Sequence, residues 1–220
     1  YVMHLFSGQR RNGDFQWFFE ALMRDVDLPI YVLSIDVVNG DNGDLSKPGI
    51  LRFWSNLMKQ GLVFAVLGGP PCETFSPARG KVLEDGSPGP RALRAPGMLW
   101  GVKGLKARER QQVSLSNSLL QAMVHFMYLA WSLGIQALME HPDVPFWNRS
   151  QRCACDPAVP HKCDHVISSF AIPELRKLSE FPDVSTLRIH QCIFGQTRKK
   201  PTRLLAVHMH TLVSMMAKHE

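Results

Sequence analysis

The chemistry in this sequence centres on one cysteine. Cys72 lies in Gly-Gly-Pro-Pro-Cys-Glu-Thr-Phe-Ser, residues 68–76, which directly follows the apolar run at 62–67. Two glycines let a ligand approach the backbone closely, and two prolines stiffen the loop that follows. A thiol held in this way is a candidate nucleophile if its pKa is lowered. The alternative is a small buried cysteine, the commoner role of this residue in proteins.

Carboxylates follow two other apolar runs. Asp36 ends the run at 30–36, where an acid suits the two hydroxyls of a ribose, as in dinucleotide-binding folds. Glu140 ends the run at 135–140, and we expect it to act with Cys72 rather than to be a solvated strand-end carboxylate. Asp44 is the next acid, and it can contact a ligand, cap the helix that follows, or do both.

A glycine turn follows the first apolar run. Ser7 and Gly8 lie in Phe-Ser-Gly-Gln-Arg-Arg-Asn-Gly, residues 6–13, between a predicted strand and a predicted helix. Glycine at such a turn allows close approach of a ligand to free amides at a helix N-terminus. A plain strand-to-helix turn is the alternative.

The elements that must position these side chains alternate along the chain. The hydrophobic pattern predicts strands at 1–6, 30–36, 62–67, 135–140, 188–195 and 202–210, and helices at 15–26, 47–61 and 108–134. Residues 77–106, rich in Gly, Pro, Arg and Lys, are expected to form a mobile loop. The alternation predicts one α/β domain over residues 1–220, with a mainly parallel, Rossmann-like sheet and helices on both faces. The strand-end residues then share one edge of the sheet.

The composition is that of a globular protein with a basic surface. The chain has 220 residues, 45% hydrophobic and 20% charged, with a net charge of +6. The positive charge and the basic segments around Cys72 favour a polyanionic partner, although a solvated surface is the alternative. No apolar run is long enough to span a membrane, and no secretion signal opens the chain, so we expect an intracellular location and reduced thiols. Because it begins at Tyr1, we expect a piece of a longer protein.

A cluster of cysteines and histidines lies in the irregular segment 153–165. Five side chains there are of types that bind zinc: Cys153, Cys155, His161, Cys163 and His165. The Cys-x-Cys spacing is tighter than the usual Cys-x-x-Cys. The segment is therefore either a structural zinc site or a surface loop.

Taken together, six segments resemble the DNA (cytosine-5) methyltransferases. They occur in that family's order and spacing: residues 4–8, 34–38, 43–45, 68–76, 137–142 and 195–207. The resemblance is closest to divergent forms from protist genomes and retroelements that lack an evident target-recognition domain. It implies S-adenosylmethionine as cofactor, DNA as partner, and a location in the nucleus if the source is eukaryotic.

The resemblance also implies roles for named residues. Cys72 would attack carbon 6 of a flipped-out cytosine, Glu140 would hold ring nitrogen 3 and the amino group, and Arg198 would hold the 2-oxo group and the nucleophile loop. The residues implied to bind the cofactor are Phe6, Ser7, Gly8, Asp36, Val37, Asp44, Leu45 and Pro70. The alternatives are methylation of cytosine in RNA, and a catalytically inactive nucleic-acid-binding domain of a polyprotein.

Several positions depart from the family pattern. Arg10 follows where a second glycine is usual, and His141-Pro142 replaces Asn-Val after the glutamate. Glu73 replaces a glutamine beside Cys72, and its charge would raise the pKa of the thiol. The chain also ends soon after the 202–210 strand, without the target-recognition domain and closing segment that the family normally has.

Overall fold

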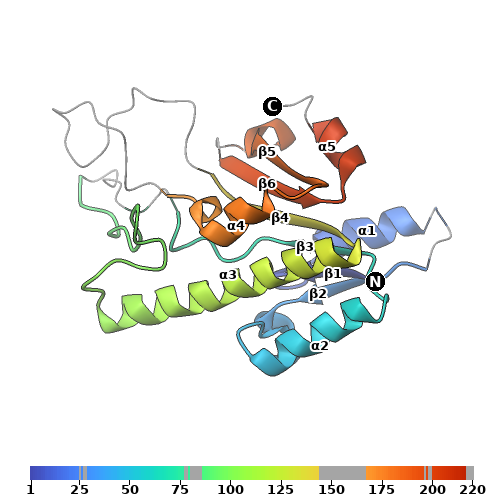
Figure 1. The fold of residues 1–220 in the computed structure, drawn as a ribbon, viewed down its shortest axis with the longest axis horizontal. Helices are drawn as coiled ribbons and strands as arrows, with labels where there is room; N and C mark the ends of the chain where they lie inside the picture. The colour runs from blue at the N-terminus through green and yellow to red at the C-terminus, as the bar shows by residue number, and fades with distance from the viewer. Residues whose placement is uncertain are drawn as a thin grey trace.

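One mixed sheet organises the part of the chain that the computed structural model describes, which is residues 1–24, 26, 29–76, 79, 86–143, 167–195, 197 and 200–216. The strands are β1 Val2–Leu5, β2 Val32–Ile35, β3 Ala65–Gly68, β4 Gln136–Pro142, β5 Val184–His190 and β6 Pro201–Val207. The helices are α1 Phe15–Met23, α2 Pro48–Lys59, α3 Ala107–Leu133, α4 Pro173–Leu178 and α5 His210–Met216 (Figure 1).

The strand order is β2-β1-β3-β4-β6-β5. β2, β1, β3 and β4 are parallel, whereas β6 runs antiparallel to both β4 and β5. The predicted α/β class with a mainly parallel sheet is therefore confirmed, with one reversed strand. The register places Leu5 beside both Ile35 and Gly68, so β1, β2 and β3 end at the same level.

The chain reverses its direction of travel across the sheet at β1. The connection through α1 leads from β1 to β2 on one side, and α2 then leads to β3 on the other side of β1. Ligands of open α/β sheets bind in the crevice at the carboxyl ends of the two strands that flank such a reversal. In this fold that crevice lies between the segments that follow β1 and β3.

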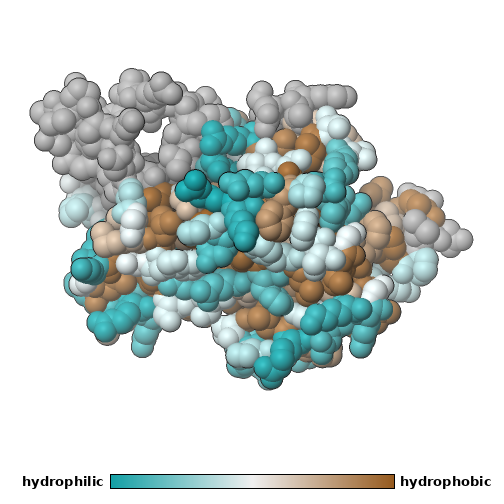
Figure 2. Space-filling view, viewed as in Figure 1, coloured by the Kyte–Doolittle hydropathy of each residue, from teal (hydrophilic) through white to brown (hydrophobic). Residues whose placement is uncertain are grey.

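Helices cover both faces of the sheet. The long helix α3 packs with α2 and α4 on one face, where its apolar side chains recur at helical spacing and are buried, among them Val113, Leu120, Met123 and Ala130. On the other face, Phe15 and Phe19 of α1 cover β1–β3, and Val213 and Met216 of α5 cover β5 and β6. Hydrophobic side chains also reach the surface at α1 (Figure 2), where Trp17, Phe18 and Leu22 are exposed.

Some predicted boundaries are wrong. β4 continues through His141 to Pro142 instead of ending at Glu140, because it pairs with β6 as far as Pro142. Pro142 has no N–H, and it is tolerated there because β3 ends opposite Met139 and leaves a neighbouring strand on only one side. The strand predicted at 188–195 lies at β5, and a 3-10 turn occupies Gln191–Phe194. The short helices α4 and α5 were not predicted, since six or seven residues show barely two turns of periodicity.

Candidate active site at the carboxyl ends of the strands

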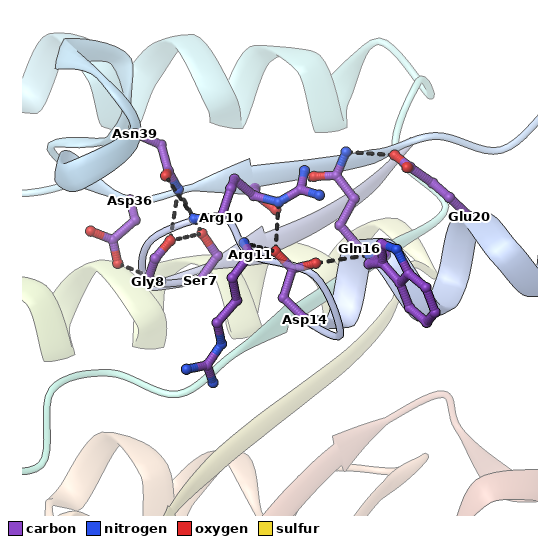
Figure 3. A network of polar contacts seen from close by, with 11 residues as sticks. Ser7, Gly8, Arg10, Arg11, Asp14, Gln16, Glu20, Asp36 and Asn39 are labelled. Atoms are coloured by element: carbon purple, nitrogen blue, oxygen red, sulfur yellow. Dashed lines mark hydrogen bonds and ion pairs between the residues drawn. The ribbon is translucent and has the colours of Figure 1, made fainter.

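The loops that follow β1 and β2 are joined by hydrogen bonds. Oδ2 of Asp36 accepts the Gly8 N–H at 2.9 Å, and Oδ1 accepts the Val38 N–H at 3.1 Å. The Asn39 amide donates to the Ser7 hydroxyl at 3.1 Å and to the Gly8 carbonyl at 2.8 Å (Figure 3). The structure therefore brings together the predicted site residues Ser7, Gly8 and Asp36.

The backbone of the first loop is held in an unusual conformation. Phe6 has a φ of 56°, in the left-handed region where side chains other than glycine are rare, and Gly8 has a φ of 69°. Such a residue costs on the order of 1–3 kcal/mol and is found mainly at functional sites. The Phe6 N–H donates to the Ile35 carbonyl at 2.8 Å, so the strained turn is fixed to β2.

Gly43 lets the loop after β2 pack closely on the backbone of Asp36. A Cβ atom on Gly43 would lie 2.0 Å from the carbonyl oxygen of Asp36, so only glycine fits there. The turn at 40–43 consequently packs on the Asp36 backbone. Asp36 and this turn line a cavity of about 450 Å³ together with Phe53 and Trp54.

The other predicted cofactor residues of this loop differ in accessibility. Val37 is 60% exposed, whereas the Leu45 side chain is buried in the core. Oδ2 of Asp44 pairs with the Lys47 ammonium at 3.3 Å, and the Ser46 hydroxyl, which donates to Oδ1, is the main cause that lowers the pKa of Asp44. Asp44 does not cap α2, whose first turn has no side-chain cap. Val37 can therefore contact a ligand with its side chain, and Leu45 only with its backbone.

The departure at Arg10 has a structural explanation. Its Nε pairs with Asp14 Oδ2 at 2.7 Å, and Asp14 also accepts the backbone N–H groups of Arg11 and Trp17 (Figure 3). These bonds cap α1 and hold the pKa of Asp14 well below its usual range. The arginine thus orders the loop between β1 and α1, beside a cavity of about 680 Å³ that Ser7 and Gly8 also line.

The loop that follows β3 carries Cys72 into the same edge of the sheet. The thiol is half-buried, and the Phe75 N–H donates to the Cys72 carbonyl at 2.9 Å, which closes a tight turn over 72–75. A Cβ atom on Gly68 would lie 3.0 Å from Met123 Sδ and 3.1 Å from Leu5 Cβ. Glycine is therefore needed where β3 passes between β1 and α3, and Pro70 just beyond it is buried.

Glu140 lies beside this loop with two partners from the end of the chain. Its Oε1 accepts the Gln191 amide at 3.2 Å and pairs with the Lys200 ammonium at 3.4 Å. Glu140, Phe6 and Gly69 line a cavity of about 380 Å³ with apolar side chains of β3 and β4. Sequence reasoning missed Gln191 and Lys200; the only signal was that Lys200 belongs to a basic segment close to the predicted Arg198.

The pKa of Cys72 reflects this environment. Burial raises it most, the Lys200 ammonium lowers it, and the carboxylates of Glu140 and Glu73 raise it further. The expected effect of Glu73 thus has the right direction but is smaller than that of burial. The Glu73 carboxylate instead accepts the Gln112 amide of α3 at 3.1 Å. Among the charged side chains that the structure describes, Lys200 is therefore the one that favours the thiolate.

The segment predicted to be a mobile loop contributes to the core in its described part. Leu93 is fully buried and Arg94 is 1% exposed, and the Arg94 guanidinium contacts the Cys72 turn. The prediction of a mobile loop over the whole segment is therefore wrong for these two residues, which are packed in the interior. The burial of Leu93 and Arg94 was not predictable from this segment of low hydrophobicity, because one leucine and one arginine give no periodic pattern.

Several predicted residues lie outside the described residues. They are Arg198 and the zinc candidates Cys153, Cys155, His161, Cys163 and His165. Among the residues that the structure does describe, no group of three or more His, Cys, Asp or Glu side chains could hold a metal ion. No helix in those ranges is long and apolar enough to cross a bilayer.

Comparison with known proteins gives no match: no protein-family model, no curated protein and no solved structure is similar to the chain. The arrangement of the candidate site places a thiol within electrostatic reach of a carboxylate and an ammonium group. The carboxylate lines a small cavity at the edge of the sheet that also holds Asp36, an acid suited to a ribose. That set of groups can support nucleophilic addition to a polar ring bound beside a nucleoside.

Proposed function

We propose that the chain is an S-adenosylmethionine-dependent methyltransferase that modifies carbon 5 of cytosine in DNA through a covalent adduct with Cys72. The observation that carries the proposal is the convergence of the Cys72 loop, Glu140 and Asp36 at the edge of the sheet where β1 and β3 flank the reversal in strand order. The resemblance of the same segments to cytosine-5 methyltransferases supports it.

The residues of the first two loops fit the cofactor. Each oxygen of Asp36 accepts one backbone N–H and retains a free lone pair for a ribose hydroxyl. The exposed Val37 side chain offers an apolar surface for a purine, and the adjacent cavity of about 450 Å³ is of the size that small-molecule sites have. When bound, S-adenosylmethionine supplies a methyl group on a positively charged sulfur.

Glu140, which lines the cavity of about 380 Å³, and the nearby Cys72 thiol fit a flipped-out cytosine. The Cys72 thiolate forms a bond to carbon 6, and the electron pair displaced from the ring double bond makes carbon 5 nucleophilic. Glu140 accepts hydrogen bonds from the amino group and from nitrogen 3 once that nitrogen is protonated, and it thereby favours a protonated ring that can take up the displaced electron pair. After carbon 5 has gained the methyl group, a proton acceptor removes the proton of carbon 5. The electron pair of that C–H bond restores the ring double bond, and the bond between carbon 6 and Cys72 breaks.

Lys200 and Gln191 support these steps through Glu140. Both donate to Oε1, which leaves Oε2 for the base, and both therefore fix the orientation of the carboxylate. The Lys200 ammonium also favours the thiolate form of Cys72. The base must leave the duplex to reach this cavity, because its ring edge is not accessible inside the stack. The net charge of +6 suits the phosphate backbone of such a partner.

The test is methyl transfer by the purified chain from labelled S-adenosylmethionine to duplex DNA and, in parallel, to RNA. We expect label in DNA cytosine, and its absence with Cys72→Ser, because an alcohol is a far poorer nucleophile than a thiolate near neutral pH. Label in RNA alone would show that RNA, and not DNA, is the substrate. Cofactor binding without transfer to either polymer would favour the alternative, an inactive nucleic-acid-binding domain. The raised pKa of Cys72 supports that alternative, because it disfavours the thiolate.

A further inference from the structure

A fully buried arginine lies beneath the proposed active site. Arg94 is only 1% exposed, and within the described ranges no carboxylate lies within ion-pair distance of its guanidinium. Burial lowers its pKa to about 10, so it remains charged at neutral pH. A buried charge that has no anionic partner among the described residues is costly, so its hydrogen bonds must offset the loss of hydration.

The guanidinium connects three parts of the chain. Its Nε donates to the Thr74 hydroxyl at 2.9 Å, its Nη2 to the Ser116 hydroxyl at 3.2 Å, and its Nη1 to the Leu99 carbonyl at 2.5 Å. Its Cζ lies 3.9 Å from the centre of the Phe75 ring. Because these acceptors lie around one planar group, a lysine ammonium would not reproduce the set.

Two of these partners belong to the turn that carries the thiol. Thr74 and Phe75 are the last two residues of the turn over 72–75, which the Phe75 N–H closes on the Cys72 carbonyl. Thr74 also pairs with Ser116 of α3 at 2.8 Å, so the turn is tied to the longest helix of the fold both directly and through Arg94.

We infer that Arg94 is a positioning residue, which fixes the Cys72 turn against α3 and thereby sets the place and burial of the thiol. The inference rests on the proposed function only in taking Cys72 as the thiol whose position matters. It concerns a residue from the segment at 77–106, to which the resemblance assigns no role in the site.

The test is the alkylation of Cys72 by iodoacetamide, followed by mass spectrometry of its peptide over a range of pH. In Arg94→Met we expect the rate constant near neutral pH to rise on the order of tenfold, because hydrogen bonds lost from a charged group shift a local opening equilibrium by about that factor. The apparent pKa of Cys72 should fall toward its ordinary value as the thiol gains solvent. Thr74→Val, which removes one acceptor and keeps the volume, should change both quantities in the same direction.

The controls separate positioning from general destabilisation. Arg91→Met removes a charge from the same segment, but Arg91 is exposed and pairs with Glu109, so Cys72 should react as in the unmodified chain. Cys192 is the internal control, since its rate should stay constant in every variant. Unchanged alkylation of Cys72 in both Arg94→Met and Thr74→Val would overturn the inference, as would parallel increases at Cys72 and Cys192.

Alkylation needs neither cofactor nor nucleic acid, so it decides the role of Arg94 even if the chain transfers no methyl group. If the unmodified chain is active, Arg94→Met should lower kcat by about 100-fold, the effect of an ångström-scale misplacement of a reacting group, and leave the Kd for S-adenosylmethionine unchanged. A more reactive Cys72 in a less active enzyme, with the rate at Cys192 unchanged, is a result that unfolding of the whole chain does not give.

Discussion

Gly69 lies directly against the carboxylate of Glu140: a Cβ atom at position 69 would lie 3.1 Å from Oε2. The loop that carries Cys72 therefore contacts the carboxylate proposed to hold the base, with no side chain between them. This contact explains the second glycine of the loop, as the packing of Leu5 and Met123 against Gly68 explains the first.

The contact predicts the effect of Gly69→Ala. The new methyl group must push the Glu140 carboxylate aside, which is easy because it meets the flexible end of a side chain. We expect the melting temperature to change little and the rate of methyl transfer to fall on the order of 100-fold, as for other small misplacements at reacting centres.

The matched control for this substitution is Gly49→Ala in α2, where a Cβ atom would meet nothing within 4 Å. Its activity should equal that of the unmodified chain. Full activity of Gly69→Ala would mean that Oε2 of Glu140 does not need the position seen here.

Lys200 is predicted to set the reactivity of the thiol. Because its ammonium lowers the pKa of Cys72, Lys200→Met should raise that pKa and slow alkylation of Cys72 near neutral pH severalfold. The difference should shrink at high pH, where the thiol is ionised in both proteins. Lys103→Met, at an exposed lysine, is the control, and an unchanged pH profile in Lys200→Met would exclude this electrostatic role.

The fold was largely predictable, because its strands are short apolar runs that alternate with amphipathic helices. The periodic side chains of α3 placed that helix to within a residue at each end. The reversed direction of β6 was not predictable, since a buried strand such as Pro201–Val207 has the same pattern in either direction. The extension of β4 through Pro142 depends on which strands end beside it, and a single sequence does not contain that information.

The placement of a residue at this edge of the sheet was predictable where it follows a strand, as Asp36 does directly after β2 and Cys72 does in the loop after β3. The partners of Glu140 were harder to predict, because Gln191 and Lys200 come from a part of the chain more than 50 residues away and meet it only through the pairing of β4, β5 and β6. The hydrogen bond of Asp44 with Ser46 and its ion pair with Lys47, both within the same turn, could not be predicted from the position of Asp44 after a strand.

His141 predicts how stability depends on pH. Burial lowers its pKa from 6.5 to about 4, and the Lys200 and Arg94 charges act in the same direction. As the pH falls below 6.5, the unfolded chain binds a proton that the folded chain does not, so stability is lost between pH 6.5 and about 4. The loss from this residue should be about 3 kcal/mol.

Urea unfolding at the two ends of this pH range measures the effect. His141→Leu should remove most of this loss, whereas His210→Gln, at an exposed histidine, should retain it. An equal loss of stability in His141→Leu and the unmodified chain would show that other groups cause the acid sensitivity.

The cofactor assignment predicts a ligand-dependent melting temperature. At a concentration 100 times the Kd, S-adenosylmethionine or its demethylated product should stabilise the fold by about 2.7 kcal/mol, which corresponds to roughly 5–10 °C for a chain of this size. Asp36→Ala should weaken the response, because its carboxylate is proposed to bind the ribose and it also holds the Gly8 loop. Glu180→Ala, an exposed carboxylate on another part of the chain, should respond normally. The absence of any shift in the melting temperature of the unmodified chain would contradict the proposal that it is an S-adenosylmethionine-dependent enzyme.

Covalent trapping tests the central claim most directly. DNA that contains 5-fluorocytosine, incubated with the chain and S-adenosylmethionine, should form an adduct that survives denaturation, because fluorine cannot leave carbon 5 as a proton does. Mass spectrometry should locate the adduct on Cys72, Glu140→Gln should form it more slowly, and Cys72→Ser should form none. Methyl transfer to DNA by Cys72→Ser at the full rate, or an adduct on another residue, would contradict the proposed mechanism.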